Sequence, residues 1–252
     1  MNDFPPASDP PQPVSPQQAV QVALPQSAPY VTYSIIGVTA FIFVLQLASQ
    51  AFAQFDLPVA ILAKANDLIR AGQLWRLLTP ALVHGSIAHI GFNMYALLSF
   101  GTGLERHFGH GRFLLLYGLG AFGGNVMSFL FTDAVSVGAS TAIFGLLSAE
   151  GVFLYQNRKL FAGQFRSAIG NVIFVAAVNL FLGLSPTIDN WGHIGGLLGG
   201  LIFTSFAGPL WEIEGIQPSY QLVDRREASG VLIGAATVLF IFGGLAMWGM
   251  VR

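Results

Sequence analysis

Seven long apolar segments follow residue 30, and they constrain the fold of this 252-residue chain more than any other feature. They span residues 32–52, 82–103, 113–131, 140–156, 168–184, 191–210 and 231–251. A helix needs about 20 predominantly apolar residues to cross a bilayer, and only helices and closed barrels satisfy the backbone hydrogen bonds in lipid. Because the segments lack the alternating pattern of barrel strands, they predict an all-α, polytopic membrane protein.

The scarcity of charged residues supports a membrane location. Asp, Glu, Lys and Arg make up 9% of the chain and hydrophobic residues 54%, whereas about 25% of the residues in an ordinary soluble domain are charged. The net charge of -1 comes without a basic stripe, which argues against a nucleic-acid partner. Since the chain has no cysteine, disulfides, thiol nucleophiles and Cys-ligated metals are excluded.

Composition divides the chain into three parts. Residues 1–30 hold eight of the 13 prolines, among Gln, Ser and Ala, which predicts a disordered, partly polyproline II tail. Residues 31–210 are expected to form a six-helix core, with residues 53–81 as a first outer loop that lies in the membrane interface. Residues 211–252 supply an inner loop and a seventh helix. With the N-terminus inside, seven Lys and Arg lie in inner loops and four outside, so we predict this orientation.

Three clusters of polar residues interrupt the apolar segments, at residues 75–93, 138–145 and 192–200. Each cluster lies at the N-terminal end of the second, fourth or sixth segment. Even-numbered segments cross the membrane in the same direction, so we expect the three clusters on the same side and at similar depth. Ionisable groups are costly in a membrane, which makes these clusters candidates for a functional site.

Ser140 and His193 have the properties of a nucleophile and its base. A serine hydroxyl is a weak nucleophile unless a base lies next to it. His193 is surrounded by glycines, and Gly192, Gly196 and Gly200 are spaced four residues apart. Such a ridge of small residues lets two helices approach closely, so we predict that His193 lies within hydrogen-bond reach of Ser140.

His89 and Asn93 are four residues apart and therefore share one face of a helix. Together with the backbone N–H of Ser140 they could form an oxyanion hole. Other interpretations stay open. Ser140 could bond back to its own helix, and His89 and Asn93 could link two helices. His84, His89 and His193 could bind a metal.

Taken together, these motifs resemble those of the rhomboid family of intramembrane serine proteases, over most of residues 72–205. The motifs are Trp75-Arg76, His84, the HxxxN of His89 and Asn93, the segment Gly103-Leu104-Glu105-Arg106-His107-Phe108-Gly109, the serine motif Gly138-Ala139-Ser140 with Phe144-Gly145, and GHIGG around His193. The resemblance implies that Ser140 is the nucleophile and that His193 is the general base and later the acid, in a dyad without a carboxylate. It also implies that His89 and Asn93 stabilise the oxyanion.

The resemblance assigns supporting roles as well. Trp75, Arg76 and Glu105 occupy positions that hold the first outer loop in shape in the family. His84 and Gly138 belong to the motifs around the site.

Two positions depart from the family pattern. Thr141 stands where the family commonly has Gly, and we expect its β-branched side chain to crowd the oxyanion region. Phe144 stands where many members have a Tyr that packs against the base, so the ring is kept and the hydroxyl is lost.

The implied function is that of an intramembrane serine endopeptidase with no cofactor and no metal. Its substrates would be single-span membrane proteins, cleaved near the outer leaflet of a bacterial inner membrane. The seventh segment resembles the 6+1 arrangement of part of the family. Two alternatives stay open, a catalytically inactive relative that binds membrane clients and a transporter that uses the histidines as a polar pathway. The chain lacks the related halves that are usual in transporters.

Overall fold

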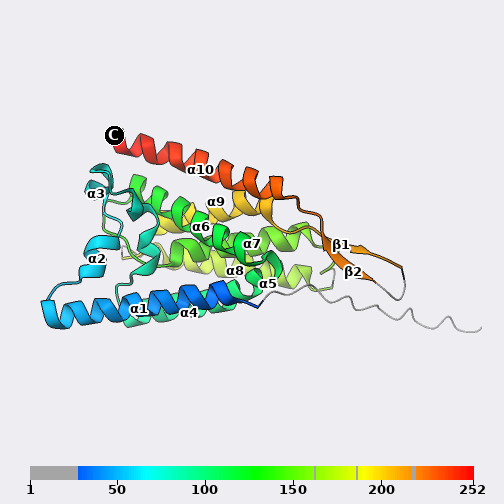
Figure 1. Ribbon diagram of the computed structural model, residues 1–252, viewed down its shortest axis with the longest axis horizontal. Coiled ribbons are helices and arrows are strands. Elements are labelled where there is room, and N and C mark those ends of the chain that lie inside the picture. Colours follow the sequence, from blue (N-terminus) through cyan, green and yellow to red (C-terminus); the bar gives the residue numbers. More distant parts are fainter. Residues whose placement is uncertain (1–27, 162, 186, 217–219) are drawn as a thin grey trace, which may run out of the picture.

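The computed structural model describes residues 28–252 except residues 162, 186 and 217–219. The predicted Pro-rich tail at residues 1–30 therefore lies almost wholly outside the described residues. Within the described part the chain is mostly helical, and its longest helices run side by side (Figure 1). Each of the seven apolar segments is helical over most of its length.

Seven helical units correspond to the seven apolar segments. They are α1 (Tyr30–Ala53), α4 (Ile87–Ala96) joined to α5 (Thr102–Phe108), α6 (His110–Phe131), α7 (Ser140–Gln156), α8 (Phe165–Leu182), α9 (Asn190–Ala207) and α10 (Ala228–Val251). A single π-helical turn, η3 (Leu97–Gly101), joins α4 to α5. Four helices of the described part are long and apolar enough to cross a membrane, namely α1, α6, α8 and α10. The shorter α7 has 17 residues, and α9 carries many glycines.

The first outer loop is folded into short helices rather than extended. It contains α2 (Leu57–Leu62), α3 (Asn66–Arg70), η1 (Leu74–Leu77) and η2 (Thr79–Leu82). Pro58 lies in the first turn of α2, where its missing N–H costs nothing, and the Asp56 side chain accepts the Val59 N–H at 3.0 Å as the N-cap. These elements lie at the same end of the bundle as the C-terminus (Figure 1).

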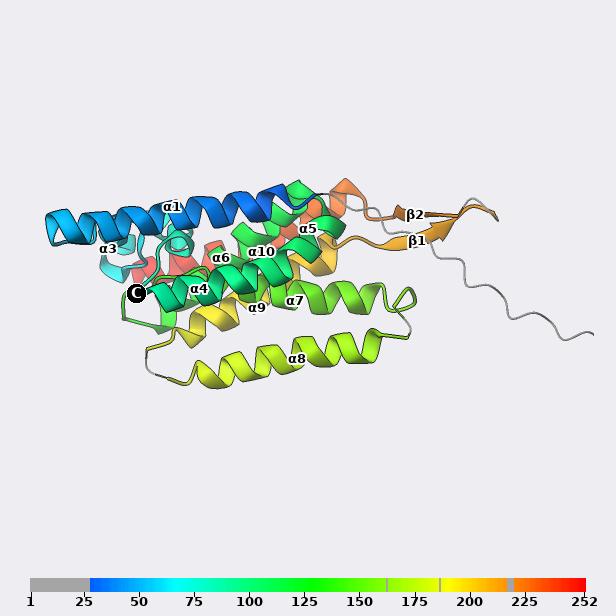
Figure 2. The same ribbon diagram turned by 90° about the horizontal axis from the view of Figure 1, so that it is seen from below.

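One connection forms a β-hairpin, so the prediction of an all-α fold is wrong at this point. Strands β1 (Trp211–Glu214) and β2 (Gln221–Asp224) pair antiparallel, with Trp211 opposite Asp224. Strand β1 alternates apolar and polar residues, which is the period of a strand, whereas β2 has two apolar residues, Leu222 and Val223, side by side. An ion pair of 2.5 Å between Arg112 and Asp224 fastens the hairpin to the start of α6. The hairpin extends from the end opposite the first outer loop (Figure 2).

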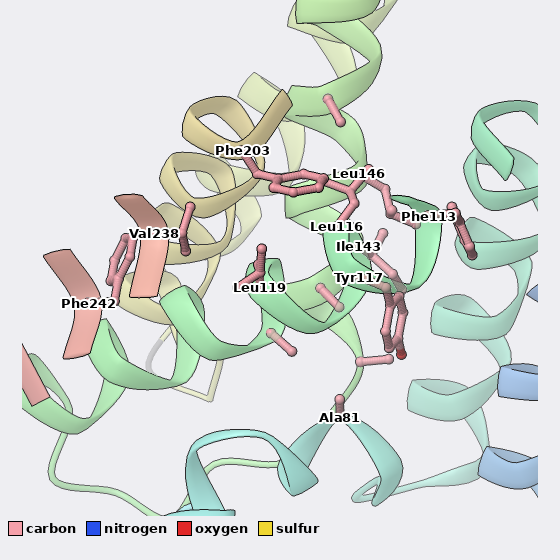
Figure 3. Close-up of a cluster of buried hydrophobic side chains, with 14 of the residues drawn as sticks. Ala81, Phe113, Leu116, Tyr117, Leu119, Ile143, Leu146, Phe203, Val238 and Phe242 are labelled. Carbon is pink, nitrogen blue, oxygen red and sulfur yellow. The ribbon is translucent and has the colours of Figure 1, made fainter. Parts of the chain in front are cut away.

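The core lies around α6, which packs against α7, α9 and α10. Leu116 and Leu119 of α6 lie in one cluster with Phe203 of α9 and Phe242 of α10 (Figure 3). All four side chains are buried. Helices α6 and α9 form this interior. They therefore hold the neighbouring helices in place, together with the polar residues at the ends of those helices.

Candidate active site

Ser140 and His193 lie together at the starts of two adjacent helices. Ser140 is the first residue of α7, and His193 lies in the first turn of α9. Ser140 Oγ is 3.1 Å from His193 Nε2, a hydrogen-bond distance in which the serine hydroxyl donates if Nε2 is unprotonated. Among the described residues, the buried Nδ1 of His193 has no hydrogen-bond partner. The pair thus has the geometry of a nucleophile and a base without a carboxylate.

Glycines of α9 let this helix approach the backbone of α7. A Cβ atom at Gly196 would overlap the carbonyl oxygen of Thr141, and one at Gly200 would overlap that of Gly145. This contact explains how His193 comes within reach of Ser140. The spacing of the glycines in the sequence indicated such an approach.

The ring of Phe144 stacks on the imidazole of His193. The two ring centroids are 4.1 Å apart and the planes differ by 13°. Phe144 lies one turn after Ser140 on α7, so the same helix carries the hydroxyl and the ring that holds the imidazole. Both Phe144 and His193 are buried. The imidazole therefore has little freedom to rotate away from Ser140.

The Thr141 side chain packs between helices, and the expected crowding of the oxyanion region stays a prediction. This side chain is buried and points toward α6 and α9. A Cβ at Gly124 would lie 2.5 Å from the Thr141 Cβ, and one at Gly192 would lie 3.0 Å from its Cγ2. The extra bulk is taken up between the helices, where Gly124 makes room for it.

His84 and His89 surround the segment that leads to Ser140. His84 is buried, and its Nε2 accepts the N–H of Ala139 at 3.3 Å. Gly138 has a φ of 121°, a conformation that favours glycine. A Cβ at Gly138 would also lie 2.7 Å from the imidazole of His89. The two histidines are 5.1 Å apart in an edge-on arrangement.

Asn93 is buried on α4, and in the described part of the chain it makes no hydrogen bond to Ser140. Its amide donates to the carbonyl of His89 at 2.9 Å, one turn earlier in the same helix. Its predicted role in oxyanion stabilisation stays a prediction.

Trp75 and Arg76 contact the first outer loop. The Trp75 indole N–H donates to the carbonyl of Ile61 at 3.1 Å. The buried Arg76 guanidinium donates to the carbonyls of Ala60 at 2.6 Å and Ala63 at 2.7 Å. A cation at the carbonyl end of a helix is favourable, so Arg76 fastens the end of α2 to η1.

Glu105 lies far from the first outer loop, so its predicted role there is wrong. Its carboxylate accepts the N–H groups of Val31 at 2.8 Å and of Thr32 at 2.7 Å, and the Thr32 hydroxyl at 2.6 Å. It therefore caps the start of α1, whereas the loop follows the end of this helix. The 24 residues of α1 separate the two places by about 36 Å.

The metal-binding alternative gains no support from this geometry. The Nε2 atoms of His84 and His193 are engaged with Ala139 and Ser140. Among the residues that the structure describes, no three His, Asp or Glu side chains form a group that could hold a metal ion.

Three further polar residues around the site were missed by sequence reasoning. Gln46 of α1 pairs with the backbone of His84, accepting its N–H and donating to its carbonyl, both at 3.0 Å. Asp189 caps α9, and the buried Lys64 fastens the first outer loop to the segment before Ser140. A signal existed for Asp189, since an aspartate just before a helix is a common N-cap. Gln46 is a polar residue within an apolar segment, and such a residue is a candidate in its own right.

Comparisons with known proteins agree on the family. The model of the rhomboid domain matches residues 71–209. The chain is 38% identical over 231 residues to the rhomboid protease GluP of Bacillus subtilis (strain 168), which covers 91% of this chain and 43% of that protein. It is 33% identical over 179 residues to RHOMBOID-like protein 9, chloroplastic, and 40% identical over 136 residues to RHOMBOID-like protein 1, both of Arabidopsis thaliana.

These two matches cover 71% and 54% of this chain, and 41% and 35% of the relatives. The chain thus spans less than half the length of each of these three relatives. The family model nevertheless covers more than half of the chain, in the part that carries Ser140 and His193. The chain belongs to the rhomboid family.

Proposed function

We propose that this chain is an intramembrane serine endopeptidase that cleaves single-span membrane proteins near the outer leaflet. The proposal depends on one observation, the 3.1 Å contact between Ser140 Oγ and His193 Nε2 within the rhomboid domain. The relationship to the rhomboid protease GluP supports it. Neither a cofactor nor a metal is needed for this chemistry.

The reaction would be acyl transfer in two steps. Ser140 Oγ attacks the scissile carbonyl while His193 Nε2 takes the hydroxyl proton, and His193 then protonates the leaving amine. Water attacks the acyl-enzyme with His193 again as the base, which releases the acid and restores Ser140.

The oxyanion would be stabilised at the start of α7. The N–H of Ser140 lies in the first turn, where N–H groups lack a partner within the helix. The next N–H upstream, that of Ala139, is already bonded to His84 at 3.3 Å. The imidazole of His89 lies against Gly138, two residues before Ser140. The Asn93 amide uses one of its two N–H donors on the His89 carbonyl, and the other would be the one to donate to the oxyanion.

We propose a membrane arrangement of six helical units and a seventh, with the N-terminus inside a bacterial inner membrane. The exposed apolar side chains of α1, α8 and α10 suit contact with lipid. The first outer loop and the starts of α7 and α9 would then lie on the outer side. The hairpin of β1 and β2 would lie on the inner side, where Arg112, Arg225 and Arg226 follow the positive-inside rule.

The test is cleavage of a model single-span substrate by the full chain in detergent. Ser140→Ala is expected to abolish cleavage, because it removes the nucleophile. Ser148→Ala is the matched control, since Ser148 lies on the same helix and its hydroxyl bonds back to Gly145 at 3.0 Å. Cleavage by Ser140→Ala would exclude Ser140 as the nucleophile. Stable binding of the substrate without cleavage by the wild type would favour the inactive, client-binding alternative.

A further inference from the structure

The Asp189 carboxylate joins three segments at the start of α9. It accepts hydrogen bonds from the hydroxyls of Ser128 and Ser136 and, at 3.0 Å each, from the Thr132 hydroxyl and the Gly192 N–H. Ser128 belongs to α6, Thr132 ends it, and Ser136 lies in the connection that leads to Ser140. One side chain therefore links α6, the α6–α7 connection and α9.

These hydrogen bonds favour the ionised form of Asp189. Burial acts most strongly and by itself raises the pKa of this carboxyl group. The bonds from Ser128, Ser136, Gly192 and Thr132 together outweigh burial, and the pKa lies below its ordinary value. A charged acceptor makes stronger hydrogen bonds than a neutral one. The junction is therefore held more firmly than hydroxyl contacts alone would hold it.

Lys64 closes the junction from the side of the first outer loop. Its fully buried ammonium group donates to the carbonyls of Thr132 at 2.5 Å and Ala134 at 2.8 Å. Its backbone also pairs with Ser136, through bonds of 3.0 and 3.1 Å. Burial lowers the pKa of Lys64 to about 8, against the opposing influence of the Asp189 charge. Lys64 thus fixes the segment whose Ser136 hydroxyl reaches Asp189.

Both members of the Ser140–His193 pair lie within a few residues of this junction. His193 follows Asp189 by four residues, and its N–H donates to the Asp189 carbonyl at 3.2 Å. Ser140 follows Ser136 by four residues, with Gly138 between them bonded to the Pro80 carbonyl at 2.9 Å. A shift of Asp189 relative to Ser136 would therefore change the separation of the two side chains.

We propose that Asp189 is a positioning residue, which fixes the start of α9 against α6 and the α6–α7 connection and thereby the distance from His193 Nε2 to Ser140 Oγ. This inference rests on the proposed function of the pair. Asp189 touches neither reacting atom and acts through the backbone of both segments. The first outer loop takes part through Lys64.

The test compares variants of the full chain in detergent micelles by the second-order rate of Ser140 modification by a fluorophosphonate. Asp189→Ala is expected to be labelled roughly 10²-fold more slowly, because a displacement of about 1 Å at a reacting pair costs that much. Asp189→Asn should be slowed less than Asp189→Ala, by about tenfold, because Asn still caps the helix but lacks the charge and the second acceptor oxygen to which Ser128 and Ser136 donate. Ser136→Ala, which keeps the backbone pairing with Lys64, should be about tenfold slower.

Asp224→Ala is the matched control, because Asp224 accepts the N–H groups of Leu210 and Arg226 at 2.9 Å each, beside the end of α9. It should lower the midpoint of unfolding without slowing the labelling. Wild-type labelling rates in Asp189→Ala, or equal slowing in Asp224→Ala, would overturn the inference. If Asp189→Ala does not fold, wild-type rates in Ser136→Ala would overturn it as well.

Hydrogen exchange separates this inference from the proposed function. Asp189→Ala should speed amide exchange in the first turn of α9 and in residues 132–138, and Asp189→Asn should speed it less. If the wild type is not labelled at all, the proposed function fails, while the exchange rates still decide whether Asp189 holds the junction. Unchanged exchange in Asp189→Ala would refute the positioning role.

Discussion

Helices α8 and α9 follow each other in the chain and have 18 residues each, yet they occupy opposite environments. Nine residues of α9 are buried, five of them glycines, whereas Val172 is the one buried residue of α8. The apolar side chains of α8, such as Phe174 and Phe181, are largely exposed. In Figure 2, α8 lies at the edge of the bundle beside α7.

The difference shows that the hydropathy of a helix in this chain does not predict how deeply the helix is buried. Helix α8 qualifies as a candidate membrane span by length and hydropathy, and α9 does not. The interior position goes to the helix whose glycines allow backbone contact, and the hydrophobic side chains of α8 face outward, as is expected of a helix that contacts lipid. His193 lies on the interior helix, among its buried residues.

Among the variants that test the contrast between α8 and α9, Gly196→Ala is expected to have the largest effect on stability and cleavage. The added methyl group would overlap the Thr141 carbonyl oxygen and force α9 away from α7. We expect a loss of about 3 kcal/mol in the free energy of unfolding, the upper end for an overpacked core, together with loss of cleavage. Unfolding in mixed detergent measures the first quantity. A variant as stable as the wild type would show that the close contact is unimportant.

A smaller effect, on kcat, is expected where Phe144 of α7 packs against the imidazole of His193 on α9. Phe144→Leu removes the ring that stacks on His193 at 4.1 Å. An aromatic stack contributes about 1 kcal/mol beyond its buried area, so kcat should fall about fivefold. Phe144→Tyr keeps the ring and is the control. Equal kcat values for the Leu and Tyr variants would mean that the stack does not orient His193.

The smallest effect, and one of opposite sign, is expected on α8. A Cβ at Gly170 would meet nothing within 4 Å, so Gly170→Ala should stabilise the protein by about 1 kcal/mol through helix propensity alone. Cleavage should be unchanged. The same unfolding measurement applies, and a destabilised Gly170→Ala variant would mean that α8 packs more closely than the contrast with α9 implies.

Much of the fold and the central pair could be predicted from the sequence. The three polar clusters begin segments that run in the same direction, which predicted that they lie at the same end of the bundle. The spacing of the glycines indicated the contact that brings His193 to Ser140. The same reasoning excludes Glu105 from the first outer loop, because Glu105 follows the far end of the second segment. The family resemblance suggested the wrong role for it.

Other features depend on contacts that no local pattern reveals. Strands β1 and β2 have four residues each, and Asp224 of β2 pairs with Arg112, which is more than 100 residues away in the sequence. The direction of the Thr141 side chain is decided by the space at Gly124 on another helix. Lys64 looked like an ordinary loop residue, since its partners Thr132 and Ala134 are about 70 residues away and are backbone carbonyls.

The central claim is that Ser140 is a nucleophile activated by His193, and labelling with a fluorophosphonate tests it most directly. We predict that the wild-type chain in detergent is labelled at Ser140, that Ser140→Ala is not labelled, and that His193→Ala is labelled far more slowly while remaining folded. Labelling of His193→Ala at the wild-type rate, or labelling that persists in Ser140→Ala, would contradict the account.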